Sequence, residues 1–284
     1  MTLRTTTHRP RTMAAALVAT VLCVGLTACS DNSDDPVVSG DNPSTPVASA
    51  GSSDSGTKLS GTLSGVGSSA QGSAMEAWIA AFNAKYPNVT INYEPSGSGA
   101  GREQFASGAV KFAGSDAALN ADETTKAKAV CGDIVQVPLY VSPIAIAFNL
   151  PGITSLQMKP DTIAKIFDQK ITSWDDAAIA ADNPGVTLPS TKITPVNRSD
   201  KSGTTENFTD YLKSAAADSW SHAVSGDWPV SGGEAAQGTS GVVAAVSAAA
   251  GAIGYADASQ VRSLGVVKVG VGSAFVEPSA DAAA

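Results

Sequence analysis

The chain has 284 residues and a formal net charge of −8, which becomes −11 once residues 1–28, with three arginines and no acidic residue, are set aside. Its length allows one large domain or two small ones. Proteins that bind nucleic acid are usually basic, so the acidic charge disfavours that class of partner. Local dipoles, rather than long-range attraction, would have to hold any anionic ligand.

Residues 1–28 have the layout of a secretory signal peptide, because basic residues precede an uncharged and mostly apolar run over 13–28. That run is short for a helix that spans a membrane. It ends in Leu26-Thr27-Ala28-Cys29, which resembles the lipobox of bacterial lipoproteins. By that resemblance Cys29 becomes the lipidated first residue of the mature protein. A plain signal peptide cleaved nearby is the alternative.

Residues 29–57 are mostly Ser, Asp, Gly and Pro, which predicts a flexible tether between a lipid anchor and a globular domain. Cys23 lies in the signal peptide and Cys29 would carry lipid, so Cys131 has no partner for an internal disulfide. His222 is the single histidine after residue 28. One histidine disfavours a Ser-His or Cys-His centre and a zinc cluster, so no enzyme activity, metal or cofactor is predicted.

Strand and helix patterns alternate from residue 58 onward. Met75, Trp78, Ile79 and Phe82 recur at helical spacing, and Pro87 ends that helix. The expected order is a strand at 58–63, this helix, strands at 89–93 and 110–113, and a helix at 121–130. Such alternation predicts an open parallel sheet with helices on both faces, where ligands bind outside the carboxyl ends of the strands.

The second half of the chain has a less regular pattern. Pro138 and Pro143 interrupt the apolar stretch 134–149, which favours a connection between lobes over one regular element. The four tryptophans are expected in the core. Further expected elements are helices at 160–167, near 176–181 and at 240–250, a turn at 183–185, and a strand entered from 251–255.

One polar stretch, 198–206, stands between two strong structural patterns. An apolar, β-branched run at 192–196 precedes it, and Phe208, Tyr211 and Leu212 follow at helical spacing. The pattern therefore predicts a strand, a tight loop and the start of a helix.

The residues of this loop suit an anion. Ser202, Gly203 and Thr204 would present free backbone N–H groups, hydroxyl groups and the positive end of the helix dipole at one point. Arg198 adds a planar fork of donors that fits a tetrahedral oxyanion. An ordinary capped helix with a solvated arginine is the alternative.

Three other loops of small residues follow expected strands, at Ser68-Ser69, at Ser98 and at Asp116. Because all of them lie at the carboxyl ends of strands, they can converge with the Arg198 loop. For the serines the alternative is turn chemistry, and for Asp116 it is a helix N-cap. An acidic residue placed among anion donors favours the functional interpretation.

These loops occur in an order that resembles a known family, the phosphate-binding subunits (PstS type) of bacterial ABC phosphate importers. The resemblance covers about residues 58–284. It rests on Gly65-Val66-Gly67-Ser68-Ser69, Ser96-Gly97-Ser98-Gly99, Phe112-Ala113-Gly114-Ser115-Asp116, Arg198-Ser199-Asp200-Lys201-Ser202-Gly203-Thr204 and Gly251-Ala252-Ile253-Gly254-Tyr255. It implies a type II periplasmic-binding-protein-like fold, with two α/β lobes and a ligand cleft between them.

The resemblance also implies a ligand, partners and contacts. The ligand would be inorganic phosphate, and the partners the membrane permease and ATPase components of an ABC importer. Asp200 matches an acid that steadies the arginine, and Ala70 stands where some members have Phe and use its backbone N–H. The implied phosphate contacts are Ser69, Ala70, Ser98, Asp116, Arg198, Ser202, Gly203 and Thr204.

In one respect the sequence departs from the family pattern. Family members cross back from the second lobe to complete the first, whereas this sequence stops at Ala284. We therefore expect a first lobe at 58–140, a second lobe at 141–284, and no return segment to the first lobe.

Two other functions remain open. Gly65, Gly67 and Ala70 fit the Ala variant of the dinucleotide fingerprint, and Glu94 could hold a ribose, although it falls later than the fingerprint expects. That alternative is a dinucleotide-binding α/β enzyme. The other is a truncated surface lipoprotein without a role in transport.

Overall fold

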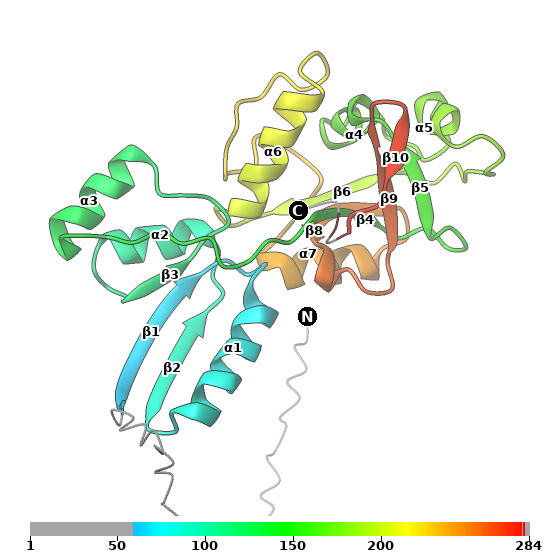
Figure 1. The fold of residues 1–284 in the computed structure, drawn as a ribbon. Helices are drawn as coiled ribbons and strands as arrows, with labels where there is room; N and C mark the ends of the chain where they lie inside the picture. Colours follow the sequence, from blue (N-terminus) through cyan, green and yellow to red (C-terminus); the bar gives the residue numbers. More distant parts are fainter. Residues whose placement is uncertain (1–58, 280, 282–284) are drawn as a thin grey trace, which may run out of the picture. The chain divides into compact units, whose positions relative to one another are not determined.

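The computed structural model describes residues 59–279 and 281, which form two β-sheets with helices packed on them (Figure 1). The predicted signal peptide, the predicted lipidation site Cys29 and the whole predicted tether lie outside the described residues. Among the helices that are described, none combines the length and the apolar character needed to cross a membrane.

The first sheet consists of three parallel strands in the order β2-β1-β3. Helix α2 packs against β1 and β3, while α1 packs against β2. Parallel strands end at the same edge, so the loops after β1, β2 and β3 meet there, as expected. The elements are β1 (Gly61–Gly67), α1 (Gly72–Lys85), β2 (Val89–Glu94), α2 (Ser98–Ala106), β3 (Phe112–Gly114) and α3 (Ala121–Cys131). We call this part the first lobe.

The second sheet has seven strands in the order β10-β9-β4-β8-β6-β7, with β5 paired to β9. Its elements are β4 (Ile144–Phe148), β5 (Ser155–Met158), α4 (Pro160–Phe167), α5 (Ala177–Asp182), β6 (Thr194–Arg198), α6 (Gly203–Ala215), β7 (Glu234–Ala236), α7 (Gly238–Ala248), β8 (Ala252–Asp257), a 3₁₀ turn η1 (Ala258–Gln260), β9 (Gly265–Val271) and β10 (Ala274–Val276). We call this part the second lobe.

The open parallel sheet expected from the pattern of 58–130 is present in the first lobe, whereas the sheet of the second lobe is mixed. Strand β4 lies between β8 and β9 and is antiparallel to both. The sequence pattern assigned 144–148 to a connection, because Pro143 and Pro138 suggested irregular chain. Pro143 instead stands just before the strand, where a missing N–H breaks no ladder hydrogen bond.

Two helices cover opposite faces of the second sheet, with α6 on one side of β6 and β8 and α7 on the other (Figure 1). The side chains of β8 therefore point alternately to the two faces of the sheet. Ile253 and Tyr255 join the core under α4 and α6, and Ala252 packs with Val242 and Val246 of α7. This packing holds the end of β6 and the start of α6 in place.

The predicted core tryptophans do not all lie in the core. Trp174 and Trp220 are fully buried, but Trp78 of α1 is 39% exposed. No residue of α1 falls in the buried class, so its apolar stripe is only partly covered. The error arose because a helical pattern shows which face is apolar but not how much protein lies over it.

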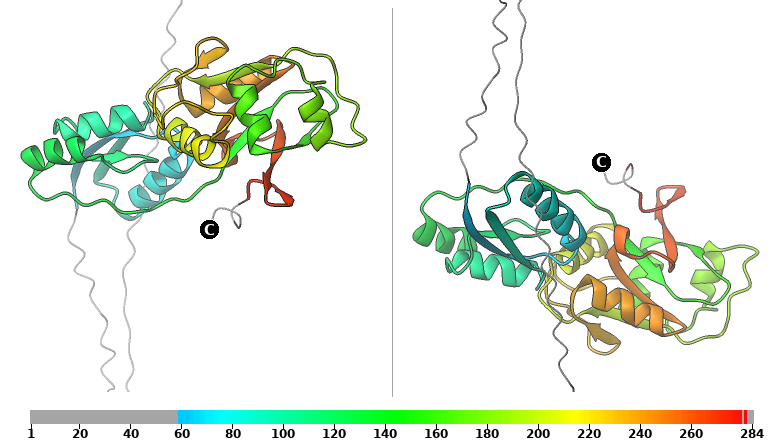
Figure 2. Two further views of the ribbon diagram at one scale, coloured as in Figure 1. Left: turned by 90° about the horizontal axis from the view of Figure 1, so that it is seen from above. Right: turned by 90° about the horizontal axis from the view of Figure 1, so that it is seen from below.

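After α3 the chain runs to β4 over residues 132–143 without a helix or strand (Figure 2). Val135, Val137, Leu139 and Val141 alternate along this stretch and are between 59% and 81% exposed. Tyr140 meets the ring of Trp78 edge-to-face, with 6.2 Å between the ring centroids. The segment therefore follows the first lobe while leaving an apolar row uncovered.

Candidate anion-binding site

The loop between β6 and α6 has the structure that its sequence predicts. Ser202 is the N-cap of α6, and its Oγ accepts a hydrogen bond from the Thr205 N–H at 3.2 Å. Gly203 and Thr204 form the first turn, whose N–H groups have no partner within a helix. All three are buried, so a ligand here would meet helix-end donors with little competition from water.

Arg198 lies at the end of β6 and is 3% exposed. Its Nε donates to Asp200 Oδ1 at 2.8 Å, and its Nη2 also bonds the same carboxylate. The Gly238 N–H donates to Asp200 Oδ1 at 2.9 Å. Burial alone would raise the pKa of the Asp200 carboxyl, but the hydrogen bonds from Arg198 and Gly238 hold it below its ordinary value. Asp200 thus stays ionised and fixes the guanidinium, and no described contact uses Nη1.

Tyr255 supports this loop from the core. Its Oη accepts from the Arg198 N–H at 3.2 Å and lies 2.7 Å from Thr205 Oγ1. Burial raises the pKa of Tyr255 to about 12. The neutral phenol therefore holds the strand end and the first turn of α6 together.

The first lobe contributes Ser98 and Asp116 to the same place. The Asp116 N–H donates to Ser98 Oγ at 3.2 Å, and Thr204 Oγ1 donates to Asp116 Oδ2 at 3.0 Å. A Cβ added to Gly203 would lie 2.7 Å from Ser98 Oγ and 2.8 Å from Asp116 Cβ. The loops after β2, β3 and β6 therefore approach so closely that position 203 has no room for a side chain.

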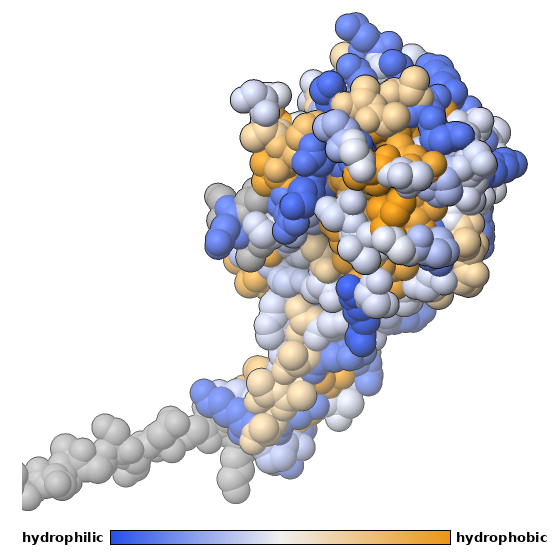
Figure 3. All heavy atoms as spheres, turned by 90° about the vertical axis from the view of Figure 1, so that its right-hand side faces the viewer, coloured by the Kyte–Doolittle hydropathy of each residue, from blue (hydrophilic) through white to orange (hydrophobic). Residues whose placement is uncertain are grey.

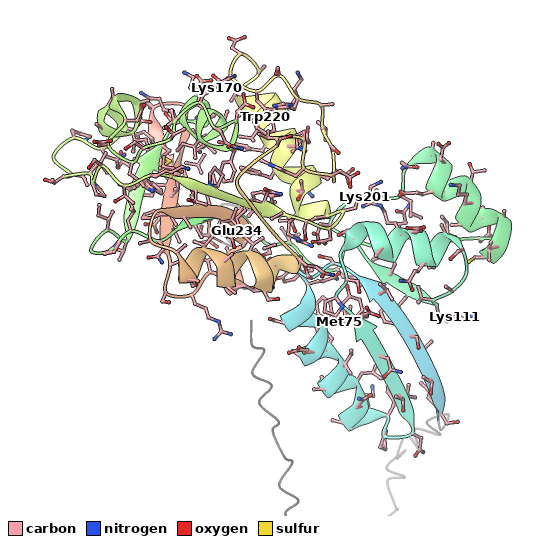
Figure 4. The ribbon with its side chains drawn as sticks, turned by 180° about the vertical axis from the view of Figure 1, so that it is seen from behind. Met75, Lys111, Lys170, Lys201, Trp220 and Glu234 are labelled. Carbon is pink, nitrogen blue, oxygen red and sulfur yellow. The ribbon has the colours of Figure 1, made fainter. Side chains whose placement is uncertain are left out.

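A backbone contact joins the lobes beside these residues. The Gly99 N–H, in the first turn of α2, donates to the Lys201 carbonyl at 3.0 Å. Figure 4 shows Lys201 between α6 and α2.

Asp116 also acts on its own lobe. Burial and the negative charge of Asp116 raise the pKa of Tyr93 well above its ordinary value. Tyr93 therefore keeps its proton and donates it to the Ser68 carbonyl at 2.9 Å. This bond ties the loop after β1 to the end of β2.

Ser69 and Ala70 lie close to a part of the second lobe that the sequence patterns did not indicate. Ser69 Oγ accepts from the Thr239 N–H at 3.0 Å and lies 3.2 Å from Thr239 Oγ1. The Ala70 N–H, which is implied as a ligand donor, donates to Ser68 Oγ at 3.2 Å. This bond spans two residues, as in turns built by serine.

Thr239 is the residue that sequence reasoning missed. It is 1% exposed and lies in the first turn of α7, directly after Gly238, whose φ is +70°. A signal was available, because Gly238-Thr239-Ser240-Gly241 precedes the apolar spacing of Val242 and Val246. The three-residue strand β7 before it is too short to show a pattern of its own.

Two open pockets border the site. One, of about 470 Å³, adjoins Arg198 and Asp200 on the second lobe. The other, of about 420 Å³, adjoins Ser69 and takes its walls from both lobes, including Pro95 and Gln237. Arg198 and Ser69 thus each line one of the two openings.

The glycines of the dinucleotide fingerprint have a different use in this fold. A Cβ on Gly65 would lie 2.3 Å from the ring of Phe112, and one on Gly67 would lie 1.9 Å from the Gly114 carbonyl oxygen. Neighbouring chain fills the space beside both glycines. Close strand packing therefore explains them without a pyrophosphate.

The structure brings together the loops that carry all eight predicted contact residues, and their role as ligand contacts stays a prediction. The arrangement combines an arginine, hydroxyl groups and helix-end N–H groups with one carboxylate. This set can hold an oxyanion that keeps a proton for the carboxylate. The two-lobed α/β architecture, with such a junction, is that of the type II periplasmic-binding-protein class.

Comparison with known proteins agrees with this class. The family described as the PBP superfamily domain matches residues 52–284, and the chain belongs to that family. The "Phosphate-binding protein PstS 3" of Mycobacterium leprae is 40% identical over 222 residues, which is 77% of this chain and 60% of that protein. The "Phosphate-binding protein PstS" of Xylella fastidiosa is 36% identical over 256 residues, 86% of this chain and 68% of that protein. The chain thus spans about two thirds or less of the length of these relatives.

Solved structures share the fold. A high affinity periplasmic phosphate-binding protein (PfluDING) bound with phosphate superposes with a TM-score of 0.63 at 25% identity, over 78% of this chain and 66% of that one. A putative phosphate ABC transporter substrate-binding protein from Clostridium perfringens, also with bound phosphate, gives a TM-score of 0.59 at 24% identity, over 74% of this chain and 76% of that one.

Proposed function

We propose that this chain captures inorganic phosphate for an ABC importer and is a binding protein, not an enzyme. The observation that carries the proposal is the position of Asp116 among anion donors, where its carboxylate accepts from Thr204 and its backbone N–H donates to Ser98. The names of the relatives support phosphate as the ligand.

Asp116 explains why phosphate suits the site better than sulfate. An ionised carboxylate can only accept hydrogen bonds. Phosphate has a second pKa on the order of 6 to 7, so near neutral pH it keeps a proton to donate. Sulfate keeps none, and its charge would be repelled in a site shielded from water. Arg198, Ser202, Gly203 and Thr204 then supply donors to the remaining oxygens.

The experiment that tests this function is thermal unfolding of the full chain with phosphate, sulfate or NAD, each at millimolar concentration. A ligand that binds only the folded state raises the melting temperature. Stabilisation by phosphate alone supports the proposal. Stabilisation by NAD and not by phosphate would favour the dinucleotide enzyme, and stabilisation by none would favour a surface lipoprotein without transport function.

We further propose that the protein acts outside the cytoplasm, held to the cell membrane by lipid on Cys29, and delivers phosphate to a permease with its ATPase. The sequence of 1–28 and the tetrapeptide ending at Cys29 support this location. Several acyl chains hold a protein at a bilayer far more firmly than one chain does. In fractionation, the wild type should stay with the membrane and Cys29→Ala should be released or remain uncleaved. A fully soluble wild type would contradict the anchor.

A further inference from the structure

Arg102 of α2 is a buried cation that none of the sequence motifs indicated. It is 4% exposed, and each nitrogen of its guanidinium has a different acceptor. Nε bonds Glu123 Oε1 at 3.2 Å, Nη1 bonds Ser115 Oγ at 3.1 Å, and Nη2 bonds Glu206 Oε2 at 3.3 Å. One side chain therefore joins α3, the loop after β3, and α6.

Two of these contacts lie within the first lobe and organise the loop that carries Asp116. Ser115 Oγ accepts from Arg102 and donates to the Ala117 carbonyl at 2.6 Å, so it braces both sides of Asp116. Glu123 belongs to the first turn of α3, where it forms a capping box with Asn120. Arg102 thus fixes the start of α3 and the Asp116 loop as one unit.

The third contact crosses to the second lobe. Glu206 is in the first turn of α6, the helix that presents Gly203 and Thr204. Among ion pairs of residues 59–279, the Arg102–Glu206 pair is the one that connects the two lobes. If the lobes separate, Arg102 keeps its partners Glu123 and Ser115, and only the contact with Glu206 is lost.

We propose that Arg102 is a positioning residue for phosphate capture: it orients the Asp116 loop, and through Glu206 it holds the first lobe closed against α6. The proposal rests on the proposed function, since the closed state is the one that would enclose phosphate. A contact present only after closure slows release of the ligand and leaves its association rate almost unchanged. The Glu206 side chain is 34% exposed, so the contribution is modest and weakens with salt.

The direction in which the rate of phosphate release changes distinguishes this role from simple charge repulsion. Glu206 is a negative charge near the proposed phosphate site, so its neutralisation alone would strengthen phosphate binding and slow release. Loss of the closing contact predicts the opposite, because the open state then forms more often. Glu206→Gln should release phosphate about 2- to 5-fold faster, the range expected for a partly exposed ion pair.

The test measures association and dissociation of inorganic phosphate for the full chain. The matched control is Asp210→Asn, which removes an exposed carboxylate from the same helix. We expect faster release for Glu206→Gln, with a ratio to wild type that shrinks in high salt, and no change for the control. Release at the wild-type rate or slower would overturn the proposal.

A second readout needs no ligand. The Gly99 N–H, bonded to the Lys201 carbonyl at 3.0 Å, exchanges its hydrogen with solvent when the lobes part. Glu206→Gln should speed that exchange about 2- to 5-fold, without changing exchange in β8. Unchanged hydrogen exchange at Gly99 in Glu206→Gln would contradict the role of the Arg102–Glu206 contact in holding the lobes closed, independently of any result with phosphate. A wild type that fails to bind phosphate would contradict the proposed function. The exchange rate at Gly99 would still test whether the Arg102–Glu206 contact holds the lobes closed.

A change at Arg102 itself tests the orienting role. Lysine keeps the positive charge, but its single ammonium group cannot replace the planar guanidinium, whose three nitrogens bond three different acceptors. Arg102→Lys should therefore loosen the Asp116 loop and narrow the preference for phosphate over sulfate, and Glu206→Gln should leave that preference nearly intact. An unchanged preference in Arg102→Lys would contradict the orienting role.

Discussion

Asp116 is the residue on which ligand choice depends in this account. Asp116→Asn should narrow the preference for phosphate over sulfate by about tenfold or more, because a hydrogen bond to a charged group contributes ~1.5–3 kcal/mol. The amide can turn a donor toward an unprotonated oxygen. The measurement is competition of sulfate against bound phosphate near pH 7. A mutant that excludes sulfate as strongly as the wild type would leave Asp116 with a structural role only.

Arg198 and Ser202 should differ in what they contribute to affinity. Arg198→Ala removes a charge-assisted donor, which is about twice as strong as a neutral one, so its loss should raise the phosphate Kd more than Ser202→Ala does. Titration calorimetry gives both values. Ser199→Ala is the control, since Ser199 is exposed next to Arg198. Equal losses in the two site variants would contradict the assignment of Arg198 as the main donor.

Stability has to be followed in both variants. Arg198→Ala leaves Asp200 without its cation, and Ser202→Ala removes the N-cap of α6, which costs ~1 kcal/mol. The melting temperature without ligand separates these losses from losses of binding.

For the candidate site, the sequence could predict which loops meet. Ser98, Asp116 and Arg198 follow strands, and parallel strands bring such loops to one edge. Thr239 and Arg102 could not be found in the same way. The position of Thr239 depends on a strand of three residues, and the role of Arg102 depends on three acceptors that only the folded chain brings together.

Among the helices, α6 begins in close contact with the first lobe, at Gly203. Gly203→Ala should weaken phosphate binding, because its Cβ would lie under 3.0 Å from both Ser98 and Asp116 and would push the lobes apart. The control is Gly241→Ala in the first half of α7, where the added Cβ meets only Ala236 at an ordinary 3.6 Å. Alanine is a better helix former than glycine, so the control should melt slightly higher.

Calorimetry with phosphate and thermal unfolding check this prediction together. We expect Gly203→Ala to keep a cooperative transition and lose affinity by tenfold or more, on the order of 1.4 kcal/mol. Wild-type affinity in that variant would mean that the lobes do not need to approach as closely at Gly203 as the structure has them.

Elements with a clear apolar pattern or start signal were predictable, whereas several strands of three or four residues were not. The helix at 160–167 was predicted with its observed bounds, since Pro160 marks its start and its apolar residues face the core. Strands β5, β7 and β10 have three or four residues each, too few for an alternating pattern to appear. Their pairing partners, rather than their own residues, decide that they are strands.

For the molecule as a whole, uncovered apolar surface should be measurable. Val135 and Val137 are 81% and 59% exposed, and they belong to the alternating row that follows α3. A folded chain with such a row should bind a hydrophobic dye. Replacing both valines by threonine keeps their shape and should reduce the fluorescence of the bound dye.

The comparison for this experiment is Val271→Thr on β9, which removes a residue 61% exposed from the second lobe. Figure 3 shows that hydrophobic spheres also gather on the side of that lobe where β5 and β10 lie. If the dye reports mainly the row after α3, the double variant should lose more signal than Val271→Thr. Equal losses of dye fluorescence would mean that the dye does not bind mainly at the row after α3.

Isothermal titration of the full chain with inorganic phosphate near pH 7 decides whether the protein binds this anion. We expect saturable binding of one phosphate per chain, with little dependence on salt because buried contacts escape screening. Sulfate under the same conditions should give no binding heat. No binding heat with phosphate, or equal heats with phosphate and sulfate, would mean that the site is not a selective phosphate site.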